Sequence, residues 1–593
     1  MTEKISIFPP LPRGGLGGVN TTSRLRSCFL ISKKMKTKLF SKKRLGKNAG
    51  DFALGIISAI LTAIPVKAAE RIYFNYGTLG LSISVDSLET FAKEGTINKE
   101  LEFYLQRVSA EEQAKFREVL LAKGDLNPVE VSRFFNSPMG EAFLQQMGNM
   151  INIPGGGNGK YPIRGALVEA AADPEGLSML NFMRKFPTDI QFNTDNIVEV
   201  VKLGELLKTA TKVMVEEVAQ LSAAETAAAK PINFSQLPDL SKPGEYGYEK
   251  QTITLIDESR HRQFLVEIYK PTRWRAGKTP VVVGSHGLSS NTEHFKIQAE
   301  HLASYGYLVV LPQHIGSDDK RLKAMLAGYK KEIFDLNEFI DRPLDVSYVL
   351  DELERRNETE YGGRLNLESV GVMGHSFGGY TVLALAGAQI NFEQLEKDCH
   401  RLIWDPNLSL LLQCEALKLP RKTYNFRDER IVAAIAINPV NSSIFGKEGL
   451  SKIQIPVALG AGTLDPAAPA VLEQLRSFTW LTTPNKYLVV MEGQAHVNVS
   501  ELNAGTEALL KSLPNLKLPP AGLPAKYGNH LHLAFFELYV VDNPDFQIYL
   551  QSAYGEYLSA QETFKLYVIS SASSEGLLQA IRDFRAREGL SNR

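Results

Sequence analysis

The sequence predicts an α/β fold, in which a mostly parallel sheet is covered by helices on both faces, preceded by an all-α helical domain. From about residue 248, short apolar runs of strand length alternate with helix-like segments, a pattern typical of such sheets. Between about 80 and 228 the apolar spacing is helical instead. The run Gly-x-Ser-x-Gly at 374–378 joins a strand-like segment to a helix-like one. A chain of 593 residues is too long for one core, so two or three domains are expected.

The first 68 residues differ from the rest in charge. They hold 13 Lys or Arg and 2 acidic residues, whereas the remainder carries a net charge of about −11. A basic segment at 36–47 precedes the short apolar run 52–65, and small residues follow immediately before Ala69. This layout predicts a secretory signal peptide at 35–68, cleaved before Ala69.

The export signal predicts an exported protein, periplasmic or extracellular. Residues 1–34 are rich in proline and glycine and are expected to be disordered, with Met35 as the expected true start. The apolar run is too short to span a bilayer, so no stable membrane span is expected. The alternative is an N-terminal amphipathic helix that stays in the cytoplasm.

Capping chemistry marks four helix starts in the predicted helical domain, 80–228. A long helix is expected at about 195–228, followed by a linker rich in proline and glycine at 229–247. No titratable cluster stands out, which favours a packed bundle; docking or substrate gating is the alternative role. The four expected caps are Asp86 and Ser109, each followed by Glu at capping-box spacing, and Asn127 and Ser137, each followed by Pro.

The predicted α/β domain, 248–593, begins with an antiparallel pair and continues with parallel strands separated by helices. Functional residues in such sheets gather at the carboxyl ends of the strands. The expected strands are 252–256, 264–269, 280–285, 307–312, 431–437, 455–460 and 486–491, with helices at about 292–304 and within 320–356.

Ser376 lies at the centre of the strand–turn–helix run. Gly374 and Gly378 flank it at two residues on each side, so neighbouring chain can pass without a Cβ clash. A hydroxyl on so tight a turn stands clear of the backbone and can act as a nucleophile. The alternative is a glycine-rich turn with a bystander serine.

Two later strand ends supply the partners that a serine nucleophile needs. Asp465 follows the strand 455–460, and His496 follows the strand 486–491. His496 would take the serine proton and Asp465 would hold the imidazole in the right tautomer. The chain order Ser, Asp, His is that of the α/β-hydrolase fold. The backbone N–H groups of Phe377 and Leu288 are the expected oxyanion donors.

The motifs His286-Gly-Leu, 301–311 and 374–379 resemble the platelet-activating-factor acetylhydrolase and dienelactone-hydrolase-like branch of α/β hydrolases. The resemblance covers about 250–500. The whole layout is similar to an uncharacterised bacterial family of predicted hydrolases with an exported helical domain. In the acetylhydrolases the acid follows the strand after the nucleophile helix, and here Asn438 holds that place.

Residues 389–428 form an insertion between the nucleophile helix and the next strand. Its apolar runs around 402–404 and 408–412 predict a lid that would suit an acyl or lipid-like substrate, or else a small core of the insertion itself. Cys399 and Cys414 are the only cysteines beyond the signal region. In an oxidising compartment they are expected to form a disulfide; two free buried thiols are the alternative.

The sequence therefore predicts an exported serine hydrolase that cleaves carboxylic esters, lipid-like or short-acyl, through an acyl-enzyme. A peptidase or thioesterase with the same triad, or a catalytically idle binding protein, are the alternatives. No metal and no cofactor is expected, because the ten histidines are scattered without ligand spacing. An acidic body without a basic stripe argues against nucleic acid as a partner. The expected partner is a small-molecule ester.

Overall fold

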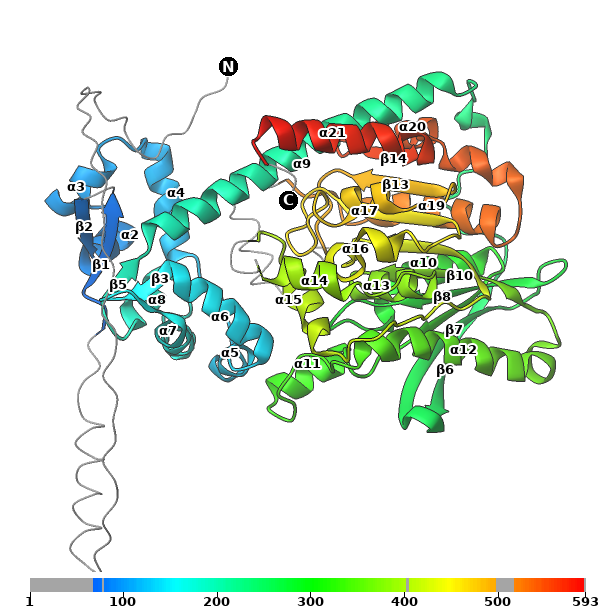
Figure 1. The fold of residues 1–593 in the computed structure, drawn as a ribbon, viewed down its shortest axis with the longest axis horizontal. Coiled ribbons are helices and arrows are strands. Elements are labelled where there is room, and N and C mark those ends of the chain that lie inside the picture. Colours follow the sequence, from blue (N-terminus) through cyan, green and yellow to red (C-terminus); the bar gives the residue numbers. More distant parts are fainter. Residues whose placement is uncertain (1–67, 77–78, 401–404, 498–516, 591–593) are drawn as a thin grey trace, which may run out of the picture.

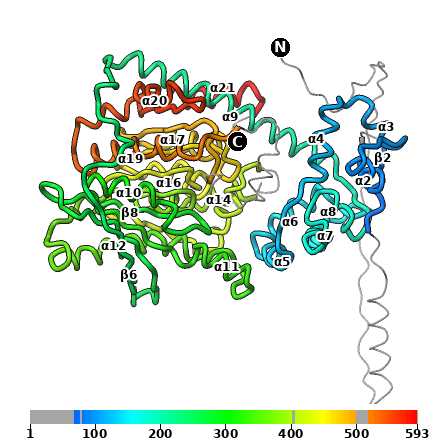
Figure 2. The backbone as a smooth tube through the Cα atoms, turned by 180° about the vertical axis from the view of Figure 1, so that it is seen from behind, coloured from blue at the N-terminus to red at the C-terminus, as the bar shows by residue number. Residues whose placement is uncertain are grey.

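The computed structural model describes residues 68–76, 79–400, 405–497 and 517–590. The segment 1–34 lies outside the described residues, as does the expected signal peptide except for its last residue, Ala68. Figures 1 and 2 show two domains from opposite sides, joined by the long helix α9 (Thr194–Ala228). The predicted long helix is therefore present with nearly the expected bounds.

The larger domain is built on a nine-stranded sheet with the order β14-β13-β12-β11-β10-β8-β9-β7-β6. The six strands from β13 through β10 and β8 to β9 pair in parallel. The β6–β7, β7–β9 and β13–β14 pairs are antiparallel. The strands are β6 (Tyr248–Asp257), β7 (Arg262–Pro271), β8 (Thr279–Ser285), β9 (Leu308–Pro312), β10 (Leu365–His375), β11 (Ile431–Ile437), β12 (Val457–Gly462), β13 (Lys486–Met491) and β14 (Leu566–Ser570).

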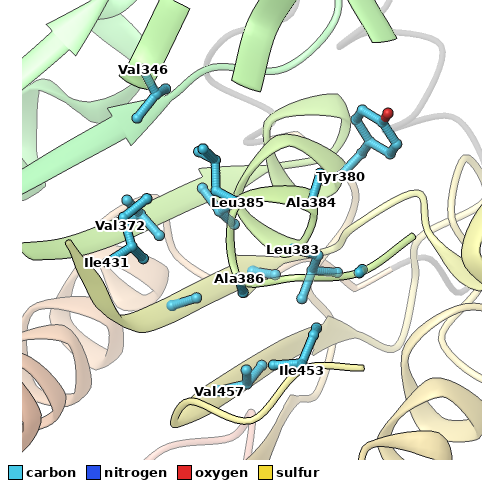
Figure 3. Close-up of a cluster of buried hydrophobic side chains, with 14 of the residues drawn as sticks. Val346, Val372, Tyr380, Leu383, Ala384, Leu385, Ala386, Ile431, Ile453 and Val457 are labelled. Carbon is cyan, nitrogen blue, oxygen red and sulfur yellow. The ribbon is translucent and has the colours of Figure 1, made fainter. Parts of the chain in front are cut away.

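Every strand predicted from the sequence is present, and 431–437 and 486–491 have the predicted bounds. The edge strand β14 was not predicted. Helices cover both faces, each over its own apolar core; Figure 3 shows part of the core between α13, α12 and the sheet. One face carries α12 (Glu338–Tyr361), α13 (Phe377–Leu385), α16 (Ser442–Leu450), α17 (Gln474–Trp480) and α21 (Ser574–Arg587), and the other α10 (Lys296–Ser304), α19 (Leu523–Tyr539) and α20 (Ser552–Ser559).

The N-terminal domain is mostly helical, but the expectation that it is all-α is wrong. A small sheet with the order β2-β1-β5-β3-β4 lies among its helices. The sheet was not predicted for two reasons. The antiparallel pair of β1 and β2 begins before residue 80, the expected start of the domain, and the other strands are too short to show an alternating pattern. The strands are β1 (Arg71–Tyr76), β2 (Leu79–Ser84), β3 (Ile151–Ile153), β4 (Gly157–Asn158) and β5 (Ile190–Phe192).

Three of the four predicted helix caps are confirmed. Ser109 forms the expected capping box with Glu112, and Asn127 and Ser137 cap helices that begin with proline. Asp86 is not a cap, because the first helix begins at Val85 and is capped by Ser84, two residues before Asp86. The helices are α2 (Val85–Glu94), α3 (Lys99–Leu105), α4 (Ala110–Leu121), α5 (Pro128–Phe135), α6 (Pro138–Met150), α7 (Lys160–Ala172) and α8 (Met179–Lys185).

The C-terminal half of α9 is anchored on the larger domain. Met214 and Val218 are buried in that domain's core. The carboxylate of Glu225 accepts hydrogen bonds from the Ser570 N–H at 3.0 Å and the Ser552 hydroxyl at 2.9 Å. The helix therefore ends as part of the larger domain rather than as a free connector.

The insertion 389–428 contains α14 (Phe392–Cys399) and α15 (Leu410–Gln413). Cys399 and Cys414 form a disulfide, which confirms the expected pairing. Leu410 and Leu412 are buried, and the apolar run 402–404 belongs to residues 401–404, outside the described part of the chain. The role of the insertion as a lid stays a prediction.

Candidate active site

Ser376 lies on a strained turn between β10 and α13. Its backbone angles, φ 56° and ψ −115°, belong to a region that costs a non-glycine residue about 1–3 kcal/mol. Glycine is required on both sides of the turn. A Cβ at Gly374 would overlap the Gly378 carbonyl, and a Cβ at Gly378 would overlap the carbonyl of Ser285 in β8. The glycines therefore allow the chain to present the serine hydroxyl above the sheet.

A continuous chain of hydrogen bonds links the three residues that follow β10, β12 and β13. His496 Nε2 lies 2.8 Å from Ser376 Oγ, and His496 Nδ1 lies 2.6 Å from Asp465 Oδ2. The side chain of Asp465 is fully buried, and its other oxygen accepts from the N–H groups of Ala467 and Ala468 at 2.9 and 2.8 Å. The carboxylate is thus fixed, and it fixes the imidazole.

The side chain of Asn438 hydrogen-bonds to backbone groups and not to the imidazole of His496. It follows β11 with φ 43°, and its Oδ1 accepts from the Gly462 N–H at 3.0 Å. Its Nδ2 donates to the Ala495 carbonyl at 3.5 Å. The amide thereby ties the end of β12 to the loop that carries His496.

The backbone amides of Leu288 and Phe377 border Ser376. Phe377 is the first residue of α13, so its N–H has no partner within the helix. Leu288 follows Gly287, at which an added Cβ would lie 3.4 Å from Ser376 Cβ. Within the described part of the chain neither amide donates to an acceptor. The two amides are therefore available to an acceptor placed next to Ser376.

Arg342, which the sequence analysis did not identify, holds the loop that carries Leu288. Its guanidinium is fully buried and donates to the carbonyls of His286 at 2.7 Å and Gly287 at 3.2 Å. It also lies 4.4 Å from the centre of the Phe377 ring. The Gly287 carbonyl belongs to the same peptide group as the Leu288 N–H. Arg342 therefore fixes that peptide plane and draws electron density away from its N–H. Burial lowers the pKa of Arg342 to about 10, so the cation persists at neutral pH.

Buried charges surround Arg342 and balance it. The carboxylate of Asp345 pairs with Arg262 at 2.7 Å and Arg260 at 3.0 Å, and Glu338 pairs with Arg262 at 2.6 Å. His314 lies between Asp345 Oδ2 at 2.9 Å and the hydroxyl of Ser285 at 3.0 Å. These residues join α12 to the ends of β7, β8 and β9, so the loop that carries Leu288 rests on a paired ionic network.

His375, directly before Ser376, was also missed, because the Gly-x-Ser-x-Gly motif allows any residue at that position. Its ring stacks on His294 with centroids 4.6 Å apart, and its Nε2 donates to the His496 backbone carbonyl at 2.7 Å. Burial keeps the pKa of His375 well below its ordinary value. The ring is therefore neutral and supports the histidine loop from below.

A cavity of about 610 Å³ lies on the histidine side of the site. Its walls come from the face of β11–β14 that packs against α19, and it reaches His375 and His496. None of the described residues of the insertion 389–428 lines it. This cavity could not be predicted from the sequence, because α19 follows His496 and carries no motif.

The described residues contain no group of His, Cys, Asp or Glu with the geometry of a metal site. In the same part of the chain, no helix combines the length and the apolar character that crossing a bilayer requires.

Two family models match the chain. That of "Alpha/beta hydrolase of unknown function (DUF1400)" matches residues 68–193, the N-terminal domain, and "Chlorophyllase" matches 238–399. The second match includes Leu288 and Ser376 and ends before Asp465. A search of curated proteins found no match. With the sheet described above, these matches identify the larger domain as an α/β-hydrolase fold, as the sequence predicted, and the chain as carrying hydrolase-type domains.

Proposed function

We propose that the protein is an exported serine hydrolase that cleaves carboxylic esters, with Ser376, His496 and Asp465 as its catalytic triad. The observation that carries the proposal is the unbroken hydrogen-bond chain from Ser376 Oγ to the buried Asp465 carboxylate. It lies beside two amides that donate to no acceptor among the described residues. The partial match to the chlorophyllase model supports a hydrolase. The resemblance to the acetylhydrolase and dienelactone-hydrolase-like branch is part of the same proposal.

The chemistry runs in two halves. Ser376 Oγ forms a bond to the ester carbonyl carbon while its proton passes to His496 Nε2. Asp465 stabilises the resulting imidazolium, and the N–H groups of Leu288 and Phe377 stabilise the oxyanion. The carbon–oxygen bond to the alcohol then breaks, and the alcohol leaves with the proton from His496. Water, activated by the same imidazole, attacks the acyl-enzyme and releases the acid and the free serine.

The test is loss of activity together with loss of labelling. Ser376→Ala should reduce kcat on short p-nitrophenyl esters by about 10³-fold or more, and an organophosphate should label Ser376 stoichiometrically in the unchanged protein. Ser235→Ala, at an exposed serine, is the matched control and should leave both readouts unchanged. Labelling at another residue, or an active Ser376→Ala variant, would overturn the proposal.

The same experiments separate the alternatives. A peptidase or thioesterase would show labelled Ser376 with preferential turnover of amides or thioesters, and an idle binding protein would show neither labelling nor turnover. No observation on the site favours these alternatives over an ester hydrolase.

Export is part of the proposal and has its own support. The DUF1400 match begins at residue 68, next to the expected cleavage site. The backbone N–H of Ala69 donates to the Phe186 carbonyl at 2.8 Å, so Ala69 is held against the folded N-terminal domain. N-terminal sequencing of protein recovered outside the cytoplasm should give a start within a few residues of Ala69; an intact Met1 or Met35 would contradict cleavage.

A further inference from the structure

We infer that the cavity beneath α19 binds a long, uncharged hydrocarbon chain of the ester substrate. This inference rests on the proposed function and adds the class of substrate. The cavity volume of about 610 Å³ lies within the usual range of small-molecule sites, about 300–1,000 Å³. The cavity lies between the sheet and α19 and is partly open to solvent, so a ligand can enter it.

The walls of the cavity are mostly apolar. Neighbouring strands contribute Ile435, Ala458, Val489 and Val568, and α19 contributes Leu531 from the opposite side. Each strand residue lies on the face of the sheet that packs against α19. A hydrocarbon chain placed here would leave water for an apolar surface, which contributes about 0.8 kcal/mol per CH₂ in transfer terms.

The cavity adjoins the candidate active site on its histidine side. It is bordered by His375 and His496, and His496 Nε2 lies 2.8 Å from Ser376 Oγ. A substrate whose carbonyl carbon sits at Ser376 can therefore extend a chain past the imidazole and under α19. The cavity is thus placed to hold one chain of a substrate bound at Ser376, and it is not a separate binding site.

The polar groups on the walls do not suit a charged occupant. Burial lowers the pKa of His532 to about 4, so its ring is neutral. The Tyr487 hydroxyl is 2.8 Å from that of Tyr539, and at the rim Glu293 is paired with Lys250 at 2.9 Å. No Lys or Arg is among the described residues that line the cavity, so they offer no fixed cation to neutralise a phosphate or carboxylate, which favours an uncharged chain.

Three uncharged atoms on the walls lack partners within the described chain: His532 Nδ1, Gln298 Oε1 and Gln494 Oε1. Buried polar atoms normally have a partner. They are therefore hydrogen-bonding points for water or for an uncharged polar group along the chain, such as a hydroxyl or a carbonyl.

The test is to fill the cavity and measure activity against chain length. Ala458→Phe places a ring in the cavity from β12, and Val489→Phe does so from β13, in case the first variant does not fold. Ala560→Phe, at an exposed alanine, is the matched control. Two substrate series distinguish the origin of the chain: methyl esters of acids from C2 to C16, and acetates of alcohols from C1 to C16.

The expected result is that kcat/KM of the unchanged protein rises with chain length in one series. The filled variants should lose more than about tenfold on its long members and stay within about twofold on methyl acetate. Loss in the acid series assigns the chain to the acyl group, and loss in the alcohol series assigns it to the leaving alcohol; either supports the inference. Equal activity of filled and unchanged proteins on all long esters would overturn it while leaving the hydrolase proposal intact. Failure of the hydrolase proposal would instead appear as no Ser376-dependent turnover at all.

Discussion

The two sides of β10 are built in opposite ways. On the side of β8, β9 and α12, which we call the packed side, buried ion pairs fill the space next to the Ser376 turn. They join Arg342, Arg262 and Arg260 to the carboxylates of Glu338 and Asp345. On the side of β11–β14 and α19, which we call the hollow side, lies the mostly apolar cavity of about 610 Å³. The strand order places the nucleophile strand between these regions.

This difference matches the demands of the proposed reaction. Oxyanion donors act best when they are already in place before the charge develops, and a dense ionic network keeps the Leu288 loop in one position. A substrate chain needs empty space, which the hollow side provides. The packed side therefore serves the transition state, and the hollow side serves the ground state of the substrate.

The largest effect should come from the histidine side. Asp465→Asn keeps the shape of the side chain, but an amide cannot stabilise the imidazolium or fix the tautomer of His496. We expect kcat to fall by roughly 10⁴-fold with little change in the free energy of unfolding. Steady-state kinetics on a short ester and urea unfolding measure the two quantities.

The control for Asp465 is Asn438→Ala, which should cost far less because the Asn438 side chain hydrogen-bonds to Gly462 and Ala495 rather than to the imidazole. Asp318→Ala is a second control, since Asp318 caps α11 (Asp319–Leu326) and accepts from Gln313. A variant Asp465→Asn with near-normal kcat, together with an inactive Asp318→Ala, would move the acid to the packed side.

The next effect should come from the packed side. Arg342→Lys keeps the charge but cannot make both hydrogen bonds to the carbonyls of His286 and Gly287. We expect kcat to fall by about 10²-fold, near the cost of losing one oxyanion donor, while KM changes only a few-fold. The affinity for a boronic acid, which mimics the tetrahedral intermediate, should fall in parallel with kcat.

A purely structural role for Arg342 predicts a different outcome. The loss would then appear as a smaller fraction of folded protein, with unchanged kcat per labelled Ser376. Arg342→Lys is preferable to Arg342→Met, because leaving the buried Glu338 and Asp345 with one cation fewer costs about 3–5 kcal/mol.

The residues on the two sides of β10 were not equally predictable from the sequence, for physical reasons. Ser376, Asp465 and His496 could be predicted because each directly follows an apolar strand, and strand ends meet at one edge of a parallel sheet. The ionic network could not be predicted. Glu338, Asp341, Arg342 and Asp345 repeat at helical spacing, and a charged stripe of that kind normally faces solvent. Only the fold shows that this stripe lies against Arg262.

The hollow side escaped prediction for another reason. The apolar residues that line it are ordinary strand residues, such as Ala458 and Val489, and a void leaves no mark on the sequence that forms its walls. The small sheet of the N-terminal domain was missed because β3, β4 and β5 are two or three residues long, shorter than any alternation that could be recognised. Motifs at strand ends were thus predictable, whereas packing was not.

The smallest expected effect is on the pH dependence of the free energy of unfolding, and it comes from a comparison of one histidine on each side. His314, on the packed side, has both ring nitrogens bonded, whereas His532, in the cavity wall, has an unpaired Nδ1. Burial, with a contribution from His301, lowers the pKa of His532 to about 4, against an unfolded value of about 6.5.

Between these two pKa values the unfolded chain binds one proton more at residue 532 than the folded protein does. The free energy of unfolding therefore decreases as the pH falls from about 6.5 towards 4, by up to about 1.4 kcal/mol per pH unit from this residue. His532→Phe removes the term, so its urea-unfolding curves at pH 7.5, 6 and 5 should show a shallower loss than those of the unchanged protein. Above pH 7 the difference between the two proteins should be constant, which is the internal control. Parallel loss over the whole range would mean that water reaches His532 and solvates its charge, and that the hollow side is wetter than its apolar walls imply.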